Sequence, residues 1–197
     1  MKSMLFRTIH RRAALVLVPL LLISAITGLT YRIGRNWFGM SDETGKQVRA
    51  IHEGAYLGES LTPIYVLITG AGLLLLIASG ITMWRRSDLP SPLRAEGTNA
   101  PRRTVRWFHR IASLALVLPL ALTALTGIGF RLSQSWLGWS EKEAKWMMDL
   151  HQGTLLFGKD YRIYYILFVG LGLLMLLGTG MKLQRWFRRG GKAQTAQ

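Results

Sequence analysis

The sequence contains no cysteine and few acidic residues. Without cysteine the chain has no disulfide, no thiolate metal site, no iron–sulfur cluster and no covalently attached c-type haem. Any metal or redox cofactor must therefore bind through other ligands. Asp and Glu total 10 against 25 Lys and Arg, which gives a formal net charge of +15. The position of these positive charges along the chain is therefore informative.

Charged side chains are missing altogether from four long stretches, residues 13–31, 60–84, 111–130 and 163–181. Each is close to the roughly 20 residues that a helix needs to cross a bilayer. The sequence therefore predicts an all-α membrane protein, a four-helix transmembrane bundle surrounded by lipid. The first stretch follows basic residues, as in a signal peptide. It lacks a small-x-small cleavage site and resembles an internal segment, so we interpret it as a membrane helix.

The positive charge lies on one side of these predicted helices. Residues 1–12, 85–110 and 182–197 hold 16 of the 25 Lys and Arg but only 2 of the 10 acids, whereas the other two loops are nearly balanced. Positive loops stay on the cytoplasmic side of a membrane. We therefore expect a multi-pass protein of the bacterial inner (plasma) membrane with both termini in the cytoplasm. No recognition motif accompanies the charge, so nucleic-acid binding is not indicated.

The chain contains an internal repeat. "IHRRAALVLVPLLLISAITGLTYRIGRNWFGMS" aligns with "FHRIASLALVLPLALTALTGIGFRLSQSWLGWS" at an offset of 99, which becomes 100 after one inserted residue. Because two crossings return the chain to its starting side, the repeat is parallel, and equivalent residues face each other across a pseudo-twofold axis. We predict two helical hairpins, 1–87 (membrane helices about 12–32 and 60–84) and 105–189 (about 110–131 and 162–183), with a cytoplasmic linker at 88–104 and a cytoplasmic tail at 190–197.

Each outer loop predicts a short interfacial helix that ends at a histidine. In "WSEKEAKWMMDLHQG", Ser140 and Glu143 form a capping box and Gly153 follows the last periodic residue. "MSDETGKQVRAIHEG" repeats this pattern less well, with Gly45 inside it.

The four histidines of the chain all lie at repeat-equivalent positions, His10 with His109 and His52 with His151. A membrane helix separates His10 from His52, so these two cannot share one centre. The axis instead pairs His10 with His109 at the cytoplasmic end and His52 with His151 at the outer end. Zinc and copper take three or four protein ligands, whereas haem needs one or two axial ligands. We therefore predict two haem b groups, with each iron held by two imidazoles.

Repeated arginines accompany both histidine pairs. Arg11 and Arg110 adjoin the cytoplasmic pair, and Arg32 and Arg131 lie near the outer pair. We interpret these four as candidate cofactor-binding residues that neutralise haem propionates. Positive-inside charge and snorkelling explain them equally well. The repeated glycines also have two explanations: they could give a macrocycle room to approach the backbone, or they could allow close helix packing.

The motifs "HRxxxLxLxLPLxLxALTG" and "LHxGxLLFGxxYR" of the second half resemble the bacterial PepSY-associated transmembrane family, also described as iron-regulated or PiuB-like membrane proteins. Ferric-siderophore reductases are among its members. The resemblance covers both hairpins and implies a haem-bearing bundle that moves electrons across the membrane. It places His10 and His109 at the family's first histidine and His52 and His151 at its second. Many members carry sizeable PepSY domains in the outer loops, which here are only about 30 residues long, so the chain is a minimal form.

We expect a transmembrane electron-transfer oxidoreductase, similar to ferric reductases. Electrons would pass from a cytoplasmic reductase or quinol to an extracytoplasmic acceptor or partner subunit, with ferric iron or a ferric siderophore as candidate acceptors. Two alternatives stay open: a b561-like quinone or superoxide oxidoreductase, and a cofactor-free membrane anchor subunit. Hydrolases, phosphate-binding enzymes and transporters are not indicated, because the sequence has no nucleophile triad, Walker pattern or intramembrane acid.

Overall fold

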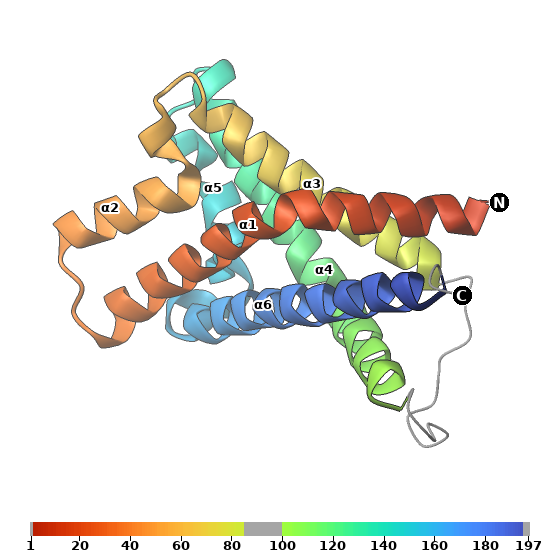
Figure 1. Ribbon diagram of the computed structural model, residues 1–197. Coiled ribbons are helices and arrows are strands. Elements are labelled where there is room, and N and C mark those ends of the chain that lie inside the picture. Colours follow the sequence, from red (N-terminus) through yellow and green to blue (C-terminus); the bar gives the residue numbers. More distant parts are fainter. Residues whose placement is uncertain (1, 85–99, 195–197) are drawn as a thin grey trace.

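The computed structural model describes residues 2–84 and 100–194, and all of its regular elements are helices. Both chain termini lie at one end of the molecule and two short helices lie at the opposite end (Figure 1). We call these the terminal end and the loop end. The elements are α1 (Lys2–Trp37), α2 (Asp42–Glu53), the 3-10 helix η1 (Ala55–Leu57), α3 (Thr62–Trp84), α4 (Ala100–Trp136), α5 (Glu141–His151) and α6 (Thr154–Gln194).

Four helices are long and apolar enough to cross a membrane, with candidate spans at Leu5–Trp37, Thr62–Trp84, Pro101–Trp136 and Thr154–Gln184. Large aliphatic side chains are exposed on their outer faces. Val16 and Leu118, for example, keep 73% and 80% of their surface accessible. Such faces are stable in lipid, where the helix satisfies its own backbone hydrogen bonds. The predicted all-α transmembrane bundle is confirmed, and the chain is a multi-pass membrane protein.

Each long helix packs against two others. Both α1 and α4 contact α3 and α6, so α1 lies diagonally opposite α4, and α3 lies diagonally opposite α6. The members of each diagonal pair are repeat-equivalent. This arrangement is the one that a parallel repeat around a central axis produces.

The buried core repeats as well. Leu21 and Leu116 are almost fully enclosed, with 1% and 2% of their surface exposed. Gly72 and Gly172 admit the core leucines of the adjacent helix, since a Cβ added at either glycine would lie within 3 Å of a leucine methyl group. Close packing of small residues against large ones is how membrane helices associate. The core residues that match between the halves are Leu17 with Leu116, Leu21 with Leu120, Ala25 with Ala124, and Leu73 with Leu173.

The inserted residue that changes the repeat offset lies in the segment that follows the short helix of the second half. In the first half this segment precedes α3, and in the second half it forms the start of α6, up to a kink at Gly158. Gly54 and Gly153 begin this segment with φ values of 71° and 72°, and Gly58 and Gly158 end it with 95° and 79°. Only glycine adopts these conformations without strain. Between the glycines the first half has the three residues of η1, and the second half has one more residue.

The helices extend beyond the predicted membrane segments. α1 runs over Lys2–Trp37 where about 12–32 was expected, and α4 begins at Ala100, inside the range predicted as linker. The absence of charge marks only the part of a helix that lies in hydrocarbon, whereas basic residues continue the helix at the interface. Residues 88–99 of the predicted linker and 195–197 of the tail lie outside the described residues.

Close packing at Gly72 gives a stability prediction. A Cβ at this position would lie 2.5 Å from Leu17, and overpacking of this kind costs about 1–3 kcal/mol. We expect Gly72→Ala to lower the melting temperature of the detergent-solubilised protein, followed by circular dichroism. Gly178→Ala is the matched control, because nothing lies within 4 Å of a Cβ there. Equal melting temperatures for the two variants would contradict the packing described here.

Candidate functional site

Two short capped helices carry the histidines of the loop end. The hydroxyl of Ser41 accepts a hydrogen bond from the backbone N–H of Thr44 at the start of α2, and Ser140 with Glu143 forms the predicted capping box of α5. α2 ends one residue after His52 and α5 ends at His151. The prediction that each short helix ends at a histidine holds for α5, whereas α2 continues one residue further, to Glu53.

The imidazoles of His52 and His151 are fixed by their Nδ1 atoms. Nδ1 of His52 lies 2.9 Å from the carbonyl oxygen of Ser24 in α1, and Nδ1 of His151 lies 2.9 Å from that of Thr123 in α4. A carbonyl oxygen only accepts, so Nδ1 donates its hydrogen and Nε2 keeps a lone pair. Metal-ligating histidines adopt this tautomer, in which a protein oxygen holds the other ring nitrogen.

Glycine makes room for each of these two rings. A Cβ at Gly28 would lie 3.2 Å from Cε1 of His52, and a Cβ at Gly127 would lie 3.1 Å from Cε1 of His151. The ring therefore rests against the bare backbone of the long helix in its own hairpin. These two glycines serve the imidazoles directly, a role that the sequence analysis did not consider.

The rings of His52 and His151 line one cavity of about 340 Å³ at the loop end. Their centroids are 6.4 Å apart and their planes meet at 73°. A metal ion midway between two imidazole nitrogens, about 2 Å from each, places the ring centroids about 6 Å apart. The centroid spacing of the pair is therefore close to the one that a shared metal ion would give.

Both rings of this pair are neutral at physiological pH. Burial lowers the pKa of His52 from its ordinary value of 6.5. Burial and, secondly, the neighbouring charge of His52 lower the pKa of His151 to about 4. Two adjacent imidazoles away from water resist protonation, because each proton adds charge that is poorly solvated and repels the other. The lone pairs on Nε2 are consequently available to a metal.

Hydroxyl groups fix the histidines of the terminal end in the same way. Nδ1 of His10 lies 2.9 Å from the hydroxyl oxygen of Ser79 in α3, and Nδ1 of His109 lies 2.7 Å from that of Thr179 in α6. Both hydroxyls donate their own hydrogen to a carbonyl four residues earlier. Each hydroxyl oxygen must therefore accept from Nδ1, which again leaves the lone pair on Nε2.

The structure keeps the two pairs apart along the bundle. Ser24 lies fourteen residues after His10, and Thr123 fourteen residues after His109. This spacing corresponds to a rise of about 21 Å along either helix. The rings of His52 and His151 lie beside each other, whereas His10 and His109 each lie against the second long helix of their own hairpin.

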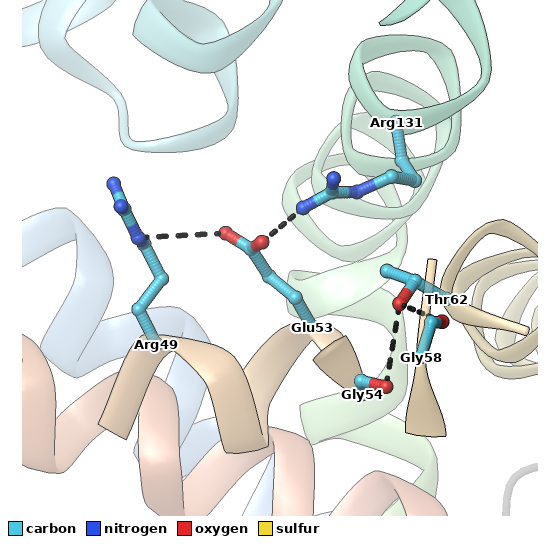
Figure 2. Close-up of polar contacts among 6 residues, drawn as sticks. All are labelled: Arg49, Glu53, Gly54, Gly58, Thr62 and Arg131. Carbon is cyan, nitrogen blue, oxygen red and sulfur yellow. Dashed lines mark hydrogen bonds and ion pairs between the residues drawn. The ribbon is translucent and has the colours of Figure 1, made fainter. Parts of the chain in front are cut away.

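The arginines of the loop end reach across to the opposite hairpin. Arg131 forms an ion pair with Glu53, whose carboxylate also lies 3.9 Å from Nε of Arg49 (Figure 2). Arg32 donates instead to the side-chain oxygen of Gln152 at 2.5 Å. Glu53 and Gln152 directly follow the two histidines, so the same cross-hairpin contact is ionic in one half and neutral in the other.

The arginines of the terminal end have unlike surroundings. Arg11 is exposed, whereas Arg110 is partly buried and donates to the backbone carbonyl of Trp84 at 3.4 Å. Arg11 and Arg110 therefore occupy equivalent positions in the repeat but differ in exposure.

Sequence reasoning missed the residues that orient the imidazoles. Ser79 and Thr179 occupy equivalent positions of the repeat, at an offset of 100, and both carry a hydroxyl group. The repeat alignment could therefore have identified them as partners of the histidines. Glu53 and Gln152 occupy the variable position of His-x-Gly in each half. The partners of His52 and His151 are backbone carbonyl groups, which every residue has, so the sequence could not identify them.

A bare metal ion has too few ligands at either pair. Within the described ranges 2–84 and 100–194, no group of three or more His, Cys, Asp or Glu could hold a metal ion. Two-histidine sites instead suit a metal that brings most of its own ligands, as iron does in a porphyrin.

The pattern that describes the PepSY-associated TM region matches residues 32–143, more than half of the chain. The chain belongs to the PepSY-associated transmembrane family. The resemblance found in the sequence motifs is thereby confirmed. No curated protein and no solved structure gives a significant match. The segment that matches the family includes His52 and His109 and ends before His151, so the pairing within each end of the bundle depends on the structure.

The hydrogen bonds to Nδ1 predict the protonation state of the imidazoles. In protein purified without cofactor and labelled with ¹⁵N-histidine, we expect a protonated Nδ1 and an unprotonated Nε2 in all four rings. His151 should stay neutral at about pH 5.5, because its lowered pKa lies well below that pH. Nitrogen chemical shifts measured by NMR test both statements. A protonated Nε2 in either loop-end ring would contradict the geometry.

Proposed function

We propose that this protein is a di-haem b-type membrane cytochrome that carries electrons from one side of the membrane to the other. The observation that supports this most strongly is the His52–His151 pair. Two neutral imidazoles line one cavity at a spacing that suits a shared metal ion, and both are held through Nδ1.

His52 and His151 would hold one haem and His10 and His109 the other, each through Nε2. When bound, each haem would accept and release one electron. The chain supplies the ring orientation through Ser24 and Thr123 at the loop end. At the terminal end, the hydroxyl groups of Ser79 and Thr179 orient the rings. Ordered Nδ1 hydrogen bonds also raise the basicity of the ligating nitrogen and so tune the metal.

The core between the two pairs supports a conduit for electrons alone. Leu21 and Leu116 are enclosed at mid-depth within a cluster of aliphatic side chains from all four long helices. The loop-end cavity extends as far as Leu21, and the side chains between the two pairs are aliphatic, which disfavours the passage of ions. Charged groups are also costly at this depth.

Charge distribution supports the proposed orientation of the bundle in the membrane. The terminal end carries most of the Lys and Arg, which favours a cytoplasmic position for it. The donor would then be a cytoplasmic reductase or a quinol that reaches the His10–His109 pair. The acceptor at the loop end would be extracytoplasmic, with ferric iron or a ferric siderophore as the candidates that the family suggests. With these assignments the protein would belong to a bacterial inner membrane.

Haem content tests the proposal directly. We expect two haems per purified chain in a pyridine haemochrome assay, and about one after His52→Ala or after His10→Ala, because one axial ligand of one site is lost. Gln47→Ala on the exposed face of α2 is the control and should keep both haems. A chain without Soret absorbance would favour the cofactor-free anchor and contradict the proposal.

The hydroxyl partners give a second test at the terminal end. Ser79→Ala or Thr179→Val removes the acceptor for Nδ1 of one ring, and loss of such a partner typically weakens metal binding about 10–100-fold. We expect weaker haem retention at this site alone, measured as haem loss to apomyoglobin. Thr82→Ala is the matched control, because the hydroxyl of Thr82 donates a hydrogen bond only to the backbone of its own helix. Identical haem loss in Ser79→Ala and Thr82→Ala would contradict the assigned role.

A further inference from the structure

The two halves of the loop-end cavity differ in charge. Arg131 and its acidic partner Glu53 neutralise each other. The equivalent pair in the other half is Arg32 with Gln152, a cation with a neutral amide. Both arginines and both partners line the cavity. Arg131, and more loosely Arg49, have the carboxylate of Glu53 beside them, whereas Arg32 has no carboxylate partner among the described residues.

Arg32 is the more deeply buried of the two arginines. Only 5% of its surface is exposed, and its Nε atom is buried without a hydrogen-bond partner. Within the described part of the chain, no ion pair joins Arg32 to an acid. Glu141 on the cavity wall is an exposed residue. A buried charge without a counterion is strongly destabilising.

A second cation increases this imbalance. Arg162 lies close enough to Arg32 for mutual repulsion, and its Nε atom is also buried without a partner. Neither guanidinium group forms an ion pair with an acid within the described residues, and an anion between them would relieve their mutual repulsion. Guanidinium donates in a planar fork that matches the two oxygens of a carboxylate.

We propose that Arg32 binds a carboxylate-bearing ligand in the loop-end cavity, and that Gln152 keeps this arginine free to do so. Arg131 does not bind this ligand, because its guanidinium group already forms an ion pair with Glu53. The ligand site is therefore one-sided within a two-fold symmetric bundle. Either a propionate of the haem in the proposed function or a carboxylate of a separate small molecule has this chemistry, and only the first source rests on the proposed function.

Two size-matched exchanges separate the halves. Gln152→Glu gives Arg32 the carboxylate partner that Arg131 has, so ligand binding should be lost. Glu53→Gln makes the opposite exchange in the other half and should leave binding at Arg32 intact. Arg32→Gln removes the guanidinium itself. Gln152→Glu introduces no change in side-chain size, so retained helicity and melting temperature are expected for it.

Two probes identify the source of the carboxylate. The full chain, purified from haem-limited cells, is titrated with haem b and with haem b dimethyl ester, in which the propionates are uncharged. It is also titrated with citrate by calorimetry. If a propionate binds Arg32, the preference for haem over its ester should fall at least about tenfold in Gln152→Glu and Arg32→Gln but not in Glu53→Gln.

If the ligand is a separate molecule, citrate affinity should show that same pattern and the haem preference should not change. Citrate binding of this pattern in a chain that takes up no haem would support the site and refute the proposed function. The inference is overturned if all four proteins bind both haem forms and citrate alike, even when two haems per chain are found.

Discussion

The hydrogen bond from Nδ1 of each histidine is the interaction on which the site depends. It ties the rings of His52 and His151 to carbonyl oxygens of α1 and α4, and those of the terminal end to hydroxyl groups. An imidazole without this contact could rotate and present either nitrogen. With it, the same nitrogen of each ring is left free in a fixed orientation, which is what the proposed haem sites require.

The repeat determines where those rings meet. Because α1 and α4 are diagonal partners, matching residues approach the axis at one depth, and at the loop end His52 has its own copy, His151, as a neighbour. Symmetry of this kind would normally make both walls of a cavity alike. The exchange of Glu53 for Gln152 breaks it at the position beside the rings, where a single charge has the greatest effect on what binds.

Much of this architecture could be predicted from the sequence, because length, apolarity and the offset of 99 constrain membrane helices strongly. The capping box of α5 was predicted as well, since its two residues act locally. The length of α1 was not, because basic residues mark the end of the hydrocarbon and not of the helix. The partners of Nδ1 at the loop end are backbone atoms, which residue identity does not encode. Arg32 and Arg131 looked equivalent in sequence, and only their contacts across the hairpins distinguish them.

The central claim is that paired imidazoles, held through Nδ1, bind the iron of a porphyrin at each end of the bundle. Electron paramagnetic resonance of the oxidised, purified protein tests it most directly, because the spin state of ferric iron reports its axial ligands. The account predicts that both centres are low-spin and six-coordinate, with two nitrogen ligands each. A high-spin centre with one open axial position, or iron outside a porphyrin, would contradict it.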